Sequence, residues 1–264
     1  MNEVGLLTAA RRQMDIFLAA VMFLTRLPVG KLHQFRIEDL ASSAVYFPVV
    51  GAFVGLAGGL ALLTALVLPS FMAVLICMLV TICLTGGLHE DGLADSADGL
   101  LGGQTLQHRL EIMKDSRIGA YGALALWFSL TAKLILIQWL VEINIVTAIK
   151  AVVIAHSLGR TAAVALLAGL PYVRPEDSKS SRFGNRVTLV QFAIGLLFPV
   201  ILSLLLLRLP GLVCLGTAIV VTLACGFYFR KKIAGITGDC LGATNQLVEL
   251  GAYIALVMLH LARP

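Results

Sequence analysis

Charged residues are scarce in this chain of 264 residues. Only 13% of the residues are Asp, Glu, Lys or Arg, whereas 59% are hydrophobic. Soluble domains carry about 25% charged residues, so this composition excludes an ordinary soluble protein and indicates an integral membrane protein. The net charge of +5 is then better explained by Lys and Arg on the cytoplasmic side of a membrane than by binding of nucleic acid.

The sequence also lacks the motifs of several large protein classes. It contains no GxxxxGK[ST], GxGxxG, GxSxG or HExxH pattern. The sequence therefore lacks the residues required for nucleotide hydrolysis by a P-loop, for dinucleotide redox chemistry and for zincin proteolysis. The five cysteines are scattered without a CxxC or Cys/His spacing, which argues against a zinc site or a redox pair.

Long apolar runs are present instead, and they predict an all-α, polytopic membrane bundle in a single domain, 1–264. A helix needs about 20 apolar residues to cross the bilayer core. Seven candidate spans satisfy or approach this length: 44–68, 71–88, 119–141, 145–170, 187–208, 210–229 and 243–261. Residues 14–24 are too short to span and predict an N-terminal interfacial or re-entrant helix.

Basic residues then predict the orientation of the bundle. Fifteen of the twenty Lys and Arg lie in the segments 1–43, 89–118, 171–186 and 230–242. With seven spans, all four segments fall on the same side, and the opposite connections are very short. The positive-inside rule places this side in the cytoplasm, so the segments 89–118 and 230–242 are expected to form cytoplasmic loops.

Residues 86–100, GGLHEDGLADSADGL, directly follow the second span and are rich in acids. If this segment is helical, Asp91, Asp95 and Asp98 stand at i, i+4 and i+7 on one face. Carboxylates at a membrane border repel one another, and a hard divalent cation is the usual counter-ion. The spacing favours Mg²⁺ held against a diphosphate, with a solvated acidic loop as the alternative.

The same segment resembles the cobalamin synthase family. Residues 85–99 match the signature TGGLHxDGLADxxDG of that family. Further matches follow in the family's order along nearly the whole chain: FLTRLP at 23–28, FPVVG at 47–51, IMKDSRIG at 112–119 and GITGDCLGA at 235–243. Glu90 stands where the family pattern has an apolar residue, so no family role is carried over to it.

This resemblance implies a transferase of cobalamin biosynthesis. The family joins adenosylcobinamide-GDP to α-ribazole or its 5′-phosphate and releases GMP. The resemblance further implies Mg²⁺ as cofactor on the three aspartates, a multi-pass location in the bacterial cytoplasmic (inner) membrane among its lipids, and an active site that faces the cytoplasm. Other enzymes of nucleotide-loop assembly become candidate partners.

Several residues near the acidic run are candidates for catalysis or substrate binding. His89 is a candidate acceptor of the proton of an attacking hydroxyl, or a helix-end histidine that faces headgroups. Residues 105–116 predict a short amphipathic helix that ends near Lys114, Asp115 and Arg117. Arg117 and Lys114 are candidate phosphate ligands, and Asp115 is a candidate catalytic carboxylate that orients Arg117 or binds metal. An ordinary surface pair is the alternative.

Two basic residues lie inside predicted spans. Arg160 is about ten residues, or roughly 15 Å at the helical rise, from the cytoplasmic end of its span. A charge at that depth is costly and usually faces a polar cavity or a partner. Contact with the diphosphate or with an acid of the site fits Arg160, and snorkelling or a structural ion pair is the alternative. Lys133 is nearer the outer face and is expected to snorkel.

The GITGD segment, 235–239, opens the last cytoplasmic loop. The glycines around Thr237, including Gly238, allow backbone N–H groups to turn toward an anion. Asp239 is a further candidate catalytic carboxylate, and Asn245 continues the candidate substrate contacts into the next helix. A simple helix cap is the alternative.

Two rival functions remain at this point. A lipid-headgroup or prenyl-type transferase would also bind magnesium on an acidic helix. A cation transporter would also use acids, but transporter sites usually lie at the midplane of the membrane, whereas these acids crowd a cytoplasmic segment.

Overall fold

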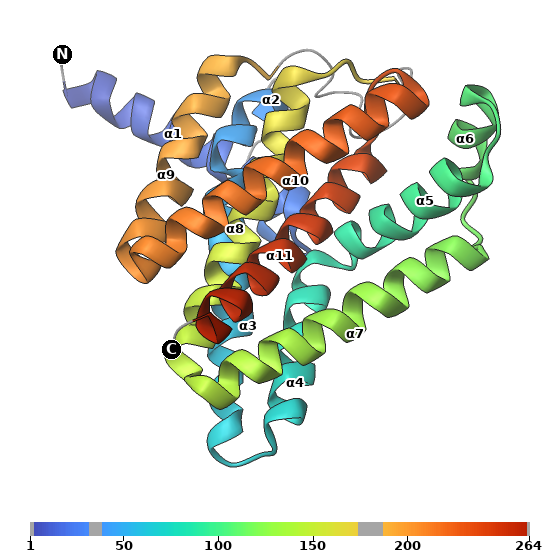
Figure 1. Ribbon diagram of the computed structural model, residues 1–264. Coiled ribbons are helices and arrows are strands. Elements are labelled where there is room, and N and C mark those ends of the chain that lie inside the picture. The colour runs from blue at the N-terminus through green and yellow to red at the C-terminus, as the bar shows by residue number, and fades with distance from the viewer. Residues whose placement is uncertain (1–2, 32–38, 174–186, 263–264) are drawn as a thin grey trace.

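The computed structural model describes residues 3–31, 39–173 and 187–262 and shows a bundle of helices (Figure 1). Within these residues there is no β-strand, and one isolated bridge pairs Tyr172 with Ile236. The α-helices are α1 (Glu3–Leu24), α2 (Asp39–Ser43), α3 (Phe47–Ala61), α4 (Ser70–Thr85), α5 (Leu88–Gly102), α6 (Leu106–Ile112), α7 (Ala120–Ile143), α8 (Ile145–Gly169), α9 (Leu189–Leu207), α10 (Leu209–Ile233) and α11 (Gly238–Leu261).

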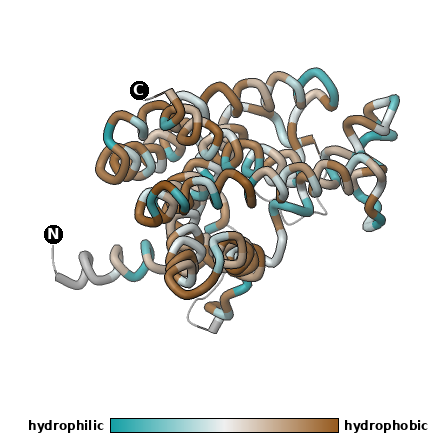
Figure 2. The backbone as a smooth tube through the Cα atoms, turned by 60° about the horizontal axis from the view of Figure 1, so that its bottom comes forward, coloured by the Kyte–Doolittle hydropathy of each residue, from teal (hydrophilic) through white to brown (hydrophobic). Residues whose placement is uncertain are grey.

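The helices confirm the prediction of an all-α, multi-pass membrane protein. Among the described residues, six helical segments are long and apolar enough to cross a membrane, and α4 with α5 makes a seventh if this bent pair is one span. Apolar residues cover most of the outward-facing helices (Figure 2). On α9, for example, Leu197 and Leu205 are 60% and 75% exposed. Such a surface suits contact with lipid and not with water.

Helix α8 forms the centre of the bundle. In its most apolar stretch 89% of the residues are buried, compared with 17% in α9, so α8 contacts protein on nearly every side. Its closest neighbour is α3, which presents Gly51, Gly55 and Gly59 at intervals of four residues. A Cβ atom at Gly51 would lie 2.4 Å from the carbonyl oxygen of His156. Small residues at this spacing allow two helices to touch through their backbones.

A sharp break separates α4 from α5. The two helices differ in direction by 86°, and Gly86 and Gly87 at the break have φ angles of +68° and +70°. Glycine adopts this left-handed conformation at little cost. The predicted span 71–88 therefore ends at Thr85. The segment 89–118, predicted as a connection between spans, is mostly helical, because α5 and α6 occupy most of it.

Two other boundaries differ from the sequence predictions. Helix α1 begins at Glu3 and is longer than the predicted interfacial helix 14–24. Helix α11 begins at Gly238, so the end of the GITGD segment is the first turn of a helix and not a loop. Most of the predicted cytoplasmic loop 171–186 lies outside the described residues.

Candidate functional site

A cleft of about 110 Å³ lies where α5, α8 and α11 meet. Its lining includes five of the residues singled out in the sequence: His89, Asp91, Arg160, Gly238 and Asp239. Apolar residues complete the lining, among them Phe23, Leu24, Phe47, Leu88 and Leu241. The structure thus brings together a histidine, two carboxylates and an arginine from segments that are far apart in the sequence.

Two glycines bring the acids of α5 and α11 together. Gly92 packs so closely on α11 that a Cβ atom there would lie 2.9 Å from the carbonyl oxygen of Asp239 and 3.1 Å from Cα of Gly242. A Cβ atom at Gly242 would in turn lie 3.2 Å from Cα of Gly92. Only glycine permits this backbone contact, which sets Asp91 and Asp239 beside the same cleft.

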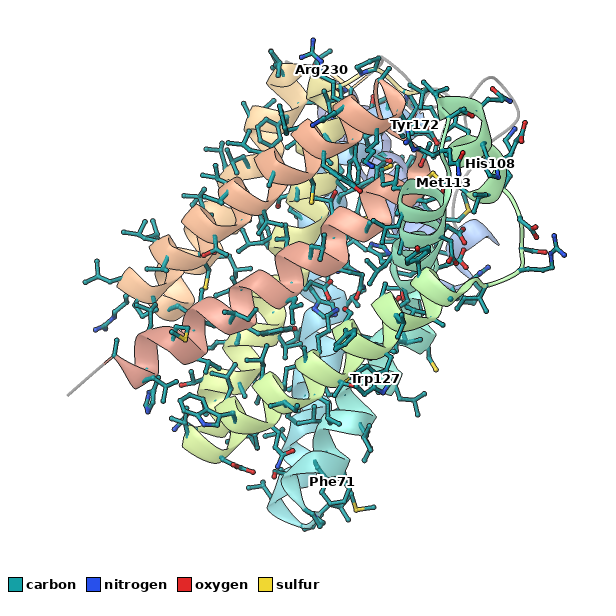
Figure 3. The ribbon with its side chains drawn as sticks, turned by 45° about the vertical axis from the view of Figure 1, so that its right-hand side comes forward. Phe71, His108, Met113, Trp127, Tyr172 and Arg230 are labelled. Atoms are coloured by element: carbon teal, nitrogen blue, oxygen red, sulfur yellow. The ribbon has the colours of Figure 1, made fainter. Side chains whose placement is uncertain are left out.

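The first turn of α11 faces this cleft. Thr237 caps the helix, because its Oγ1 accepts a hydrogen bond of 3.3 Å from the N–H of Cys240. The N–H of Gly238 donates to Oη of Tyr172 at 2.9 Å, which fixes the end of α8 to the start of α11. Figure 3 shows Tyr172 at the same end of the bundle as His108, Met113 and Arg230, opposite Phe71. The positive end of a long helix dipole favours an anion here.

Asp98 has a structural role that its spacing did not predict. Its Oδ2 accepts a hydrogen bond of 2.7 Å from the N–H of Gly119, and its Oδ1 accepts one of 2.9 Å from the N–H of Gly122. The carboxylate is buried and satisfies the first turn of α7. Asp98 therefore joins α5 to α7, as a side chain at a helix N-terminus does.

Asp91 and Asp95 are the two aspartates of the motif that remain candidate ligands of a magnesium ion. Asp91 is exposed and lines the cleft, and Asp95 follows one helical turn later. Within the described part of the chain, no group of three or more His, Cys, Asp or Glu is arranged to hold a metal ion. Mg²⁺ does not need such a cage, because it commonly binds one or two carboxylates together with water and the phosphates of a substrate.

The segment after α6 does not contribute to the cleft. Thr105 caps α6, because its Oγ1 accepts a hydrogen bond of 3.2 Å from the N–H of His108. Asp115 and Arg117 form an exposed pair with a 2.6 Å contact, and Lys114 is also exposed. The hydrogen bonds from Arg117 lower the pKa of Asp115 to about 2. The structure thus shows the surface pair that was the alternative interpretation, and neither residue lines the cleft.

Arg160 is bound on one side by an acid that the sequence did not single out. Its Nη1 donates to Oε1 of Glu249 and, at 3.3 Å, to Oδ1 of Asn245. Asn245 is fully buried and does not line the cleft. The prediction that Asn245 contacts substrate is therefore replaced by its contact with Arg160. Arg160 itself lines the cleft, and its Nε is buried with no partner among the described residues.

The prediction that Lys133 snorkels to the outer interface was wrong. Lys133 is 5% exposed, and its Nζ donates to Oε2 of Glu249 and to Oε1 of Gln246, both at 2.6 Å. The Nε2 of Gln246 donates to Oε1 of Glu90 at 3.0 Å. A signal was available in the sequence, since Lys133 and Glu249 are opposite charges inside two apolar spans and such residues usually pair.

Comparisons with known proteins indicate one family. The family profile described as cobalamin-5-phosphate synthase matches residues 16–257. A curated protein of Vibrio parahaemolyticus, named adenosylcobinamide-GDP ribazoletransferase, is 38% identical over 256 residues, which are 95% of this chain and 94% of that protein. Proteins of the same name from Shewanella piezotolerans and Shewanella frigidimarina are 38% and 37% identical, over 94% and 95% of this chain and 96% and 97% of their own lengths.

No solved structure matches the chain significantly. The family profile nevertheless covers all of the residues that line the cleft. The chain belongs to the cobalamin-5-phosphate synthase family.

Proposed function

We propose that this chain is an adenosylcobinamide-GDP ribazoletransferase of cobalamin biosynthesis. A ribose hydroxyl of α-ribazole, or of its 5′-phosphate, attacks the phosphorus on the cobinamide side of the diphosphate. A new P–O bond forms, the bond to the GMP phosphate breaks, and GMP leaves. The observation that carries this proposal is the cleft that gathers His89, Asp91, Arg160 and Asp239 in a member of this family.

The cleft supplies what a phosphoryl-type transfer requires. Such a reaction depends on positioning and on neutralisation of charge more than on covalent help from the protein. The N-terminus of α11 and the guanidinium of Arg160 offer positive charge to the diphosphate. His89 is 4% exposed, and its Nδ1 has no partner among the described residues. It is therefore our candidate to take the proton of the attacking hydroxyl.

We propose Mg²⁺ as the cofactor, held by Asp91 and Asp95. When bound, it would neutralise the oxygens of the diphosphate and of the leaving GMP. Asp98, the third predicted ligand, does not bind the metal in this proposal but holds the start of α7 in place, because both of its oxygens already accept backbone hydrogen bonds. Asp239 lines the same cleft and orients substrate or water.

We also propose that the protein lies in the bacterial cytoplasmic membrane with the cleft toward the cytoplasm. Fifteen of the twenty Lys and Arg lie in the segments assigned to that side. The cleft lies near the ends where α3 and α11 begin, and α10 ends there with Arg230, Lys231 and Lys232. A large corrinoid can approach this end without entering the bundle.

Product analysis with purified protein in detergent tests the function. We expect GMP release that requires Mg²⁺, adenosylcobinamide-GDP and α-ribazole together, with one cobalamin formed for each GMP. Removal of Mg²⁺ with EDTA should abolish it, and Asp91→Asn should greatly reduce it. GMP release without acceptor would indicate a hydrolase, and transfer to a lipid alcohol would indicate a lipid-type transferase. Either result, or ion flux into liposomes without GMP release, would refute the proposal.

A further inference from the structure

A buried set of polar residues lies behind the cleft, and we call it the Glu249 network. It comprises Glu90 of α5, Lys133 of α7, Arg160 of α8, and Gln246 and Glu249 of α11. Lys133, Arg160, Gln246 and Glu249 are each no more than 5% exposed. Its hydrogen bonds run from Glu90 through Gln246, Lys133 and Glu249 to Arg160. The network thus connects the helix of the acidic motif with the arginine of α8 that lines the cleft.

Glu249 is the centre of this network. Its two oxygens bind two different cations: Oε2 accepts from Lys133 at 2.6 Å, and Oε1 accepts from Nη1 of Arg160. The network contains two acids and two bases, so its formal charges balance. This balance allows ionised side chains to persist inside an apolar bundle, where an unpaired charge would be very costly.

Stability is not a sufficient explanation for such a network. Burial of an ion pair costs desolvation energy that its attraction rarely repays, and apolar residues of similar volume often stabilise a protein as well or better. Ionisable residues inside membrane spans are by default functional candidates. The geometry at Arg160 indicates the function. Nη1 makes all of the hydrogen bonds of its guanidinium to the described residues, while Nε is buried without a partner there and the side chain lines the cleft.

We propose that Glu249 is a positioning residue that holds one edge of the Arg160 guanidinium and so presents the other edge to the phosphates of the substrate. Lys133 neutralises the second oxygen of Glu249, which keeps the carboxylate from drawing Arg160 out of the cleft. Glu90, through Gln246, fixes the distance between α5 and this assembly. The inference rests on the proposed function, since it assigns the phosphate contact of that same cleft.

Glu249→Gln is the first test, because glutamine keeps the shape and removes the charge. We expect donor binding to weaken and kcat to fall by about 10- to 100-fold, the range seen when a contacting pair is uncoupled. Glu142→Gln is the matched control. Glu142 is also paired, with Ser70 and Gln138, but at the exposed opposite end of the bundle, and we expect wild-type values.

A double-mutant cycle with Arg160→Lys separates positioning from a structural role. Lysine keeps the charge of Arg160 but lacks the planar fork that binds two oxygens at once. The dissociation constant of adenosylcobinamide-GDP is measured without acceptor by equilibrium binding, so that the cycle closes even if turnover is undetectable. If Glu249 acts through Arg160, Glu249→Gln should add little to the loss already caused by Arg160→Lys.

Two results would overturn the inference: binding and turnover of Glu249→Gln at the wild-type level, or losses that multiply in the double variant. If Glu249→Gln does not insert, the same cycle is run with Glu249→Asp. Aspartate keeps the charge balance and withdraws the carboxylate by one methylene, so we expect a smaller loss that again disappears in the Arg160→Lys background. Absence of GMP release by the wild type would instead refute the proposed function.

Discussion

Gly92→Ala tests whether the contact between α5 and α11 builds the site. The new Cβ atom would lie 2.9 Å from the carbonyl oxygen of Asp239 and 3.1 Å from Cα of both Asp239 and Gly242. All three are backbone atoms, so no side chain can rotate away. Ordinary contacts of this kind begin at 3.4 Å. Helices α5 and α11 must therefore separate by about 0.5 Å to restore a normal packing distance.

The separation affects activity more than stability. Overpacking costs about 1–3 kcal/mol, whereas alanine regains about 1 kcal/mol over glycine in a helix, so the net loss of stability is about 0–2 kcal/mol. Asp91 and Asp239, however, line the cleft from these two helices, so the distance between them increases. A misplacement approaching 1 Å in a catalytic site costs up to about 100-fold in rate. We therefore expect kcat/KM to fall by about 10- to 100-fold.

The assay is steady-state GMP release in matched proteoliposomes, together with thermal unfolding in detergent. Gly102→Ala is the control, since Gly102 ends the same helix and its new Cβ atom would meet nothing closer than 3.8 Å. We expect this variant to keep wild-type activity. If Gly92→Ala also turned over at the wild-type rate, the close approach of α5 and α11 would not determine the geometry of the site.

The remaining predictions concern single carboxylates. Asp91→Asn should lower kcat, because several kcal/mol of transition-state stabilisation are lost, and should raise the Mg²⁺ concentration needed for the half-maximal rate. An unchanged Mg²⁺ dependence would contradict the assignment of Asp91 as a metal ligand. Asp98→Asn should lower the melting temperature in detergent through a loss of about 1–3 kcal/mol, because one of the two backbone donors of α7 loses its acceptor; an unaltered melting temperature would rule out the capping role. Asp115→Asn should leave the pH–rate profile unchanged above about pH 4. The pKa lowered to about 2 keeps Asp115 ionised there, and any stability it adds is complete above its ordinary pKa of 3.8 and lost only as pH falls through about 2. A shift in the acidic limb of the pH–rate profile of this variant would show that the protonation state of Asp115 affects the rate.

Much of the architecture follows from the sequence alone. Apolar runs determine the spans because each helix must satisfy its own backbone in lipid. The spacing in the acidic run places Asp91 and Asp95 on one helical face. These properties depend only on residues within a few turns of one another. The family was recognised separately, from the resemblance of residues 85–99 and the other motifs to those of cobalamin synthases.

Contacts between distant segments required the tertiary structure. The sequence spacing treats Asp91 and Asp98 alike, but only the fold shows that α7 begins at the carboxylate of Asp98. Hydropathy treats Lys133 as a residue near the edge of a span, whereas the fold pairs it with Glu249, 116 residues later. Side-chain pairing across helices depends on rotation and depth of each helix in the bundle, which close packing of glycines determines and local periodicity does not encode.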